Sequence, residues 1–387
     1  MGDKMTIRLD VNRQMLKWAR ENAGYTFEDL PKYLKDAEKW ELGEKKPTWN
    51  DLRKLSKKYK RPSFFFFLQE PPEEKIDYIE FRSDNKIIEF SSDLKLEIRK
   101  TKFKRTALIK VYNQMGVNPP NFKNFVSDEK DADNLAKHIR NYLNIPIEQQ
   151  QKWIFNENGN KDYTHNGFLT HWKEVCFNLG ILVFETSNIA EEELSGFSLY
   201  EDYFPIIILN GKNSHNRRIF TLMHELAHLT QGKTAICDVD KHNTKETFCN
   251  KVAAEILVPQ KTLSDSFIFN NKNEIKTSEL SHRYGVSKQT IIYKLYSSNH
   301  INNKMKERWI SKLEYDSQKD KEKTKTQKKN TTPHISTIIR KRKLEGIPYT
   351  KFILEAYTNE LISSTEAMRY LDVNWENLKK VEFEIMG

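Results

Sequence analysis

Residues 224–228 read His-Glu-Leu-Ala-His and lie within a helix-like, largely apolar run from Arg217 to Leu229. Positions four apart lie on nearly the same face of a helix, so two imidazoles at this spacing can bind one zinc ion. The glutamate beside the first imidazole can then reach a water molecule on the ion. So short a pattern also arises by chance, in about one chain in a hundred, and the alternative is a helix with two histidines on its polar face.

A zinc site needs a third protein ligand, and a catalytic site also keeps a fourth position open. The metzincin continuation requires glycine at position 231 and histidine at position 234, but the chain has Gln231 and Thr234 there. The best candidate is Glu246, which lies eighteen residues after His228 (246 − 228), at the start of the next predicted helix. Weaker candidates lie in the intervening segment: Asp238, Asp240 and His242.

The helix that begins near Glu246 carries two further polar residues of interest. Asn250 lies four residues later on the same face, where its amide could hold the free ring nitrogen of a ligating histidine. Glu255 lies about two and a half turns after Glu246, so we expect it on the opposite face, in contact with solvent. The helix is predicted to end before Pro259.

The other apolar patterns predict an α+β fold that is predominantly helical. Short runs rich in valine, isoleucine and phenylalanine predict strands of a small sheet at residues 181–185, 196–200 and 204–210. The third run could bind an extended substrate by strand addition, or it could be ordinary sheet core. Further helical patterns span residues 77–113, 132–143 and 168–179, and a helix-turn-helix-like pattern spans 278–299.

The N-terminal region reads as a compact helical unit, with helices predicted from Met15 to Ala19, after Thr26, at Trp40 and after Thr48. It resembles the phage-repressor-like helix-turn-helix through Ala19-Arg20, Gly24-Tyr25-Thr26, Asp29-Leu30, Trp40-Glu41, Gly43 and Pro47-Thr48. The resemblance implies a recognition helix in the major groove of DNA. The stretch from Gly24 to Gly43 is shorter than that pattern and contains Pro31, so dimerisation or docking is the alternative role.

The 387-residue chain carries a net charge of +10, which favours nucleic acid or an acidic partner, or reflects solvated lysines. One basic segment could meet phosphates or form a solvated helix face: Lys95, Arg99, Lys100, Lys102, Lys104 and Arg105. No individual DNA-binding residue is assigned. The cysteines are few (Cys176, Cys237 and Cys249) and the N-terminus has no apolar signal segment, so we expect a cytoplasmic protein without a membrane span.

The segment from His224 to Pro259 resembles the ImmA/IrrE zinc metallopeptidases. The likeness is carried by His224-Glu225-x-x-His228 and then by Glu246-x-x-Cys249-Asn250-x-Val252-Ala253-Ala254-x-Ile256-Leu257-Val258-Pro259. That family has alanine, phenylalanine and methionine where this chain has Cys249, Val252 and Val258. The resemblance implies that Zn²⁺ is bound by His224, His228 and Glu246. It also implies that Glu225 is the catalytic base.

These features predict a cytoplasmic zinc endopeptidase that hydrolyses a peptide bond in a partner protein. The resemblance implies that the partner is a transcriptional repressor, whose cleavage switches expression of a mobile element or of a stress or defence response. One alternative is a non-proteolytic DNA-binding regulator or toxin–antitoxin component that keeps the fold as a scaffold; a zinc-dependent nuclease or other hydrolase is another. Three residues are candidates for the oxyanion donor, although a structural role is commoner for such residues: His282, Tyr284 and Tyr293.

Five segments are expected along the chain. Residues 1–72 form the helix-turn-helix-like domain, 73–165 a helical connector, 166–312 a zincin-like peptidase domain, 313–333 a lysine-rich linker and 334–387 a helical C-terminal domain. In the last segment Ser363 and Glu366 predict a capping box. An apolar stripe accompanies it: Leu361, Ala367, Tyr370, Leu371 and Leu378. A homodimer is among the expected assemblies.

Overall fold

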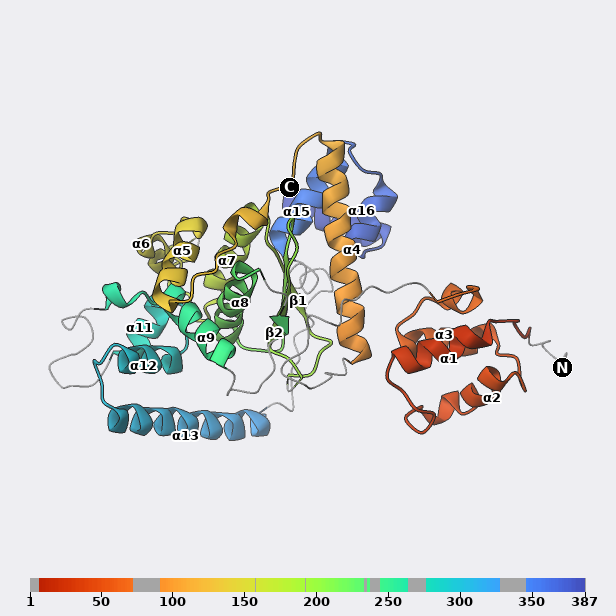
Figure 1. The fold of residues 1–387 in the computed structure, drawn as a ribbon, viewed down its shortest axis with the longest axis horizontal. Coiled ribbons are helices and arrows are strands. Elements are labelled where there is room, and N and C mark those ends of the chain that lie inside the picture. The colour runs from red at the N-terminus through yellow and green to blue at the C-terminus, as the bar shows by residue number, and fades with distance from the viewer. Residues whose placement is uncertain are drawn as a thin grey trace. The chain divides into compact units, whose positions relative to one another are not determined.

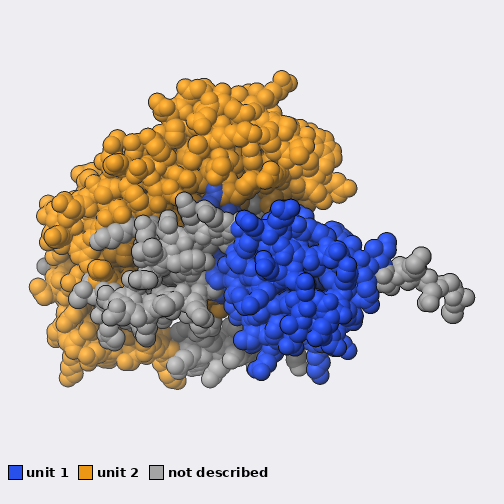
Figure 2. Space-filling view, turned by 45° about the vertical axis from the view of Figure 1, so that its right-hand side comes forward, with its two compact units in different colours: residues 1–102 blue, residues 103–387 orange. Residues whose placement is uncertain are grey.

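The structure is a computed structural model that describes residues 7–71, 91–156, 158–191, 193–232, 235–236, 244–263, 276–327 and 346–386. The chain divides into two compact units, residues 1–102 and 103–387, which Figure 2 shows in different colours. The boundary falls inside the helix α4 (Ser92–Gln114). None of the helices in the described ranges combines the length and the apolar character of a membrane span.

The N-terminal unit is built from α1 (Arg13–Asn22), α2 (Ala37–Leu42) and α3 (Trp49–Tyr59) around a small apolar core. The predicted first helix, the segment at Trp40 and the helix after Thr48 are thereby confirmed. Thr48 precedes α3 and caps it with a capping box, in which the Thr48 hydroxyl accepts from the Asp51 amide at 3.2 Å. The core contains Met15, Leu16, Ala19, Trp40, Leu52, Leu55 and Phe66.

The helix predicted after Thr26 does not form, and this prediction was wrong. Thr26 and Asp29 do make capping hydrogen bonds, with the Thr26 amide donating to Asp29 Oδ2 at 2.8 Å. The chain then makes only a 3₁₀ turn at Lys32–Leu34, after an extended Pro31. Proline has no amide hydrogen and disfavours helical geometry in the residue before it, so the helix cannot propagate through this point.

The basic residues of α4 bind within the protein. Lys95 donates to the carbonyl of Asn22, Arg99 to that of Lys60 at 3.1 Å, and Arg105 to that of Tyr203 at 2.9 Å. Each of these three side chains therefore has a hydrogen-bond partner within the chain, and contact of this segment with phosphates stays a prediction. The apolar phase of the helix is confirmed, because its predicted inward residues are buried: Leu94, Ile98, Ala107 and Leu108.

The C-terminal unit contains a four-stranded sheet of order β1-β3-β2-β4, formed by Leu182–Thr186, Ile206–Asn210, Gly196–Leu199 and Ala235–Ile236 respectively. The β1–β3 pair is parallel, and β2 is antiparallel to both β3 and β4. The three predicted strands are confirmed, whereas the short β4 was not predicted. Because β3 is paired along both edges and fully buried, it is sheet core, and its predicted use for strand addition was wrong.

Helices surround this sheet (Figure 1). The helix α8 (His215–Thr230) packs on β2 and β3 and also against α9 (Thr244–Leu257), which in turn contacts α5 (Ala132–Leu143). Their shared core is apolar and includes α7 (Asn166–Asn178). Other helices described in this part are α6 (Ile147–Lys152), α11 (Thr277–Tyr284) and α12 (Lys288–Ser297).

The chain continues through α13 (Asn303–Gln327), α15 (Ile347–Thr358), α16 (Ser364–Tyr370) and α17 (Trp375–Met386). The predicted capping box of Ser363 and Glu366 is confirmed. The lysine-rich segment expected as a linker from residue 313 is instead helical through Gln327, because lysine, glutamate and glutamine are good helix formers. The rest of that segment, residues 328–333, lies outside the described residues.

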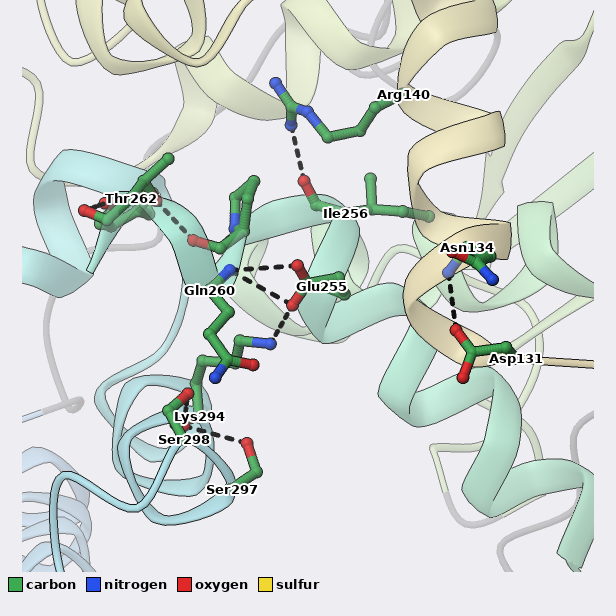
Figure 3. Close-up of polar contacts among 12 residues, drawn as sticks. Asp131, Asn134, Arg140, Glu255, Ile256, Gln260, Thr262, Lys294, Ser297 and Ser298 are labelled. Carbon is green, nitrogen blue, oxygen red and sulfur yellow. Dashed lines mark hydrogen bonds and ion pairs between the residues drawn. The ribbon is translucent and has the colours of Figure 1, made fainter. Parts of the chain in front are cut away.

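Glu255 is buried rather than solvent-facing, which corrects our expectation. Its carboxylate forms an ion pair with Lys294 of α12 and accepts from the Gln260 amide at 3.1 Å (Figure 3). On the same part of α9, Arg140 donates to the carbonyl of Ile256 at 2.6 Å. The helix is thus covered by α5 and α8 and tied to α12, so the face opposite Glu246 is not a solvent face.

We expect Lys294→Met to lower the free energy of unfolding by about 3 kcal/mol, because the Glu255 carboxylate would stay buried without its cation. Urea denaturation followed by circular dichroism measures this change. The double variant Glu255→Gln/Lys294→Met serves as the control and should recover most of the loss, since no buried charge remains. A single variant as stable as the wild type would show that the ion pair contributes nothing.

Candidate metal centre

The helix α8 carries the His-Glu-Leu-Ala-His sequence through the core. Ser214 caps its N-terminus, and the Ser214 hydroxyl accepts from the Arg217 amide at 3.3 Å. Every residue from Thr221 to Thr230 is buried, because the helix is enclosed by the sheet on one side and by α9 on another. His224 and His228 are each 6% exposed, and Glu225 is fully buried. Polar groups placed so deeply need partners, and these partners form the site.

Three side chains from α8 and α9 converge. His224 Nε2 lies 3.0 Å from Glu246 Oε2, and His228 Nε2 lies 3.4 Å from Glu246 Oε1. The two imidazole Nε2 atoms are 3.1 Å apart. One ligand atom from each residue lies within 4.8 Å of the others, so the three could hold a metal ion. Two imidazoles and a carboxylate are a donor set that suits zinc.

The other ring nitrogens of both histidines also have partners on α9. His224 Nδ1 lies 3.0 Å from Asn250 Oδ1, the acceptor position that the sequence suggested. His228 Nδ1 lies 3.6 Å from Cys249 Sγ, a contact that the sequence analysis missed. Because each Nδ1 contacts a side chain of α9, each ring presents its Nε2 toward Glu246, and Asn250 and Cys249 take the positions of outer partners to metal-binding histidines. The sequence offered one indication of the Cys249 contact: Cys249 directly precedes Asn250, which was already expected near a histidine.

The two carboxylate oxygens of Glu225 differ in their hydrogen bonding. The Ser198 hydroxyl of β2 donates to Glu225 Oε2 at 2.9 Å. Glu225 Oε1 is buried and has no hydrogen-bond partner among the described residues. Ser198 was also missed, and the available signal was a polar residue inside an otherwise apolar, fully buried strand.

The carboxylate of Glu246 and the two imidazoles perturb one another. Burial acts to raise the pKa of Glu246, but hydrogen bonds from His224 and His228 outweigh it and hold that pKa well below its usual range. Burial likewise acts to lower the pKa of His224, and the hydrogen bond to Glu246 with the nearby carboxylate charges raises it overall. Protons therefore compete with a metal for this site, and acid should weaken metal binding.

The remaining candidates lie elsewhere or outside the described residues. His282 Nδ1 is 3.0 Å from His165 Nε2, the Tyr284 hydroxyl donates to Thr262 Oγ1 at 2.9 Å, and Tyr293 is 49% exposed. His282 and Tyr284 thus contact other protein side chains, and an oxyanion role for any of the three stays a prediction. Three alternative ligands of the sequence analysis fall outside the described residues: Asp238, Asp240 and His242.

Comparison with known families bears on the same part of the chain. Residues 176–296 match a peptidase family model described as the IrrE N-terminal-like domain. This IrrE-like segment runs from the end of α7 into α12 and contains all the residues of the candidate metal centre. No curated protein and no solved structure matches the chain. The match supports the ImmA/IrrE resemblance and a metallopeptidase-like domain, and it does not extend to the N-terminal unit.

We expect Asn250→Ala to weaken zinc binding about 10- to 100-fold, because His224 would lose the acceptor that fixes its ring. Competition with a chromophoric chelator measures the zinc affinity. Asn250→Asp keeps an acceptor oxygen at this position and is the matched control, expected to bind zinc nearly as well as the wild type. Equal zinc affinity in Asn250→Ala and the wild type would show that this hydrogen bond does not organise the site.

Proposed function

We propose that this protein is a zinc-dependent endopeptidase that hydrolyses a peptide bond in a partner protein. The observation that carries the proposal is the convergence of His224, His228 and Glu246 within 4.8 Å, beside a buried Glu225 whose Oε1 has no hydrogen-bond partner among the described residues. A zinc ion held by these three residues would polarise the carbonyl of a peptide bond and lower the pKa of a water molecule. The match to the IrrE N-terminal-like domain supports the same activity.

The reaction assigns Glu225 the role of general base and then general acid. Its free oxygen, Oε1, would accept a proton from the attacking water and return it to the leaving amine. The imidazoles of His224 and His228 are held by their contacts to Asn250 and Cys249, so the ligand atoms need little rearrangement. Burial of these groups strengthens their electrostatic interactions with a substrate.

An extended substrate segment would bind at the β4 edge of the sheet. In the sheet formed by the described residues, β3 is paired on both sides, whereas β4 is at the edge and pairs with Phe197 and Ser198 of β2. Ser198 of β2 contacts Glu225, the proposed catalytic glutamate. The strand β4 is next to β2, whereas β1, at the opposite edge, is separated from β2 by β3. A peptide added at the β4 edge would form main-chain hydrogen bonds, with little dependence on its sequence.

The substrate is proposed to be a cytoplasmic transcriptional repressor, whose cleavage would switch on genes of a mobile element or of a stress or defence response. The support for this is the ImmA/IrrE resemblance around the metal centre. A non-proteolytic DNA-binding regulator or toxin–antitoxin component is the second candidate, favoured by the net charge of +10. Strongly salt-dependent DNA binding with a preference for one sequence, and no proteolysis, would favour this second candidate.

Glu225→Gln should reduce cleavage of the partner about 10²- to 10⁴-fold, because a neutral amide cannot accept the proton. The measurement is co-expression with repressors encoded near the gene, followed by mass spectrometry of the cleaved product. Zinc content of the purified variant is the control and should equal that of the wild type. Protein that binds no zinc would refute the metal centre, and undiminished cleavage by the zinc-loaded variant would refute the role of Glu225.

A further inference from the structure

A serine of the central sheet lies directly against the glutamate of the metal-binding helix. Ser198 and Glu225 are both fully buried, and the Ser198 hydroxyl donates to Glu225 Oε2 at 2.9 Å. We propose that Ser198 is a positioning residue, which fixes the Glu225 carboxylate so that Oε1 faces the reacting water. This inference rests on the proposed function, because it assigns Ser198 a part in the same reaction.

Two neighbouring contacts join β2 and α8. Gly196 and Ser198 are two residues apart in a strand and share one face of the sheet. Thr221 and Glu225 are four residues apart on α8 and share one face of the helix. Gly196 lies against Thr221, and Ser198 lies against Glu225. One face of β2 therefore contacts one face of α8 at two consecutive positions.

Glycine at position 196 makes the close approach possible. A Cβ atom there would lie 2.5 Å from Thr221 Cγ2 and 2.9 Å from the carbonyl oxygen of Ile208. No side chain fits in that space, so α8 could not lie this close to β2 with any larger residue. Because β2 and α8 lie so close together at Gly196, a side chain as small as that of Ser198 can reach Glu225.

The strand that carries Ser198 is held on both sides. Ser198 is aligned with Ile207 of β3 and with Ala235 of β4. A hydroxyl on such a strand has little freedom to move, and a hydrogen bond to a carboxylate is stronger than one between neutral groups. The bond therefore limits rotation of the Glu225 carboxylate while leaving its second oxygen for the reaction.

The test compares Ser198→Ala, which removes the donor, with Ser198→Thr, which keeps it. For partner cleavage, we expect Ser198→Ala to lower kcat about 10- to 100-fold and to leave KM and zinc affinity nearly unchanged. Ser198→Thr should restore most of kcat. Ser281→Ala removes a hydroxyl from another buried serine, on α11, and serves as a matched control that should retain kcat.

A second measurement does not depend on the partner protein. Acetohydroxamate binds zinc and gives a proton to a neighbouring carboxylate, so its affinity for the zinc-loaded protein reports on Glu225. We expect Ser198→Ala to weaken this binding about tenfold and Ser198→Thr to restore it, with Ser281→Ala unaffected. Wild-type affinity for acetohydroxamate in Ser198→Ala would overturn the positioning role. Zinc-loaded wild type that cleaves no partner would instead refute the proposed peptidase function.

Discussion

The packing of α8 against α9 is the interaction on which the candidate metal centre depends. The two imidazoles come from α8 and the carboxylate from α9, so neither helix holds the donor set alone. The far end of α9 is fixed by polar contacts: Arg140 and Gln150 donate to the carbonyls of Ile256 and Leu257, and Lys294 pairs with Glu255. Because α9 is one continuous helix, fixing its last turns also constrains the position of Glu246 in its first turn.

Much of this site could be predicted from the sequence, since it depends on helical periodicity. The spacing of His224 and His228 placed them on one face of a helix, and the start of the next helix suggested Glu246 and then Asn250. The structure brings these four side chains together. Local spacing is sufficient here because each pair lies within one helix, and only the meeting of the two helices needs tertiary packing.

Other features could not be predicted, because they depend on which elements become neighbours. Glu255 was expected in solvent, yet the face on which it lies meets Lys294 of α12. The contact between Ser198 and Glu225 depends on the packing of α8 on β2, which the sequence of the strand does not indicate. The helix after Thr26 failed for a local reason, since the capping residues were recognised correctly but Pro31 prevents the turn that should follow.

The order of the strands has a consequence for how the protein is made. The strand β3 precedes α8 in the chain, whereas β4 follows it, and both pair with β2. A nascent chain that has left the ribosome only as far as Thr230 has both imidazoles but lacks an edge of the sheet and the whole of α9. The three candidate ligands therefore come together only after α9 has emerged and docked. A chain interrupted before α9 therefore lacks Glu246, the third candidate ligand, and cannot assemble the donor set of the candidate metal centre.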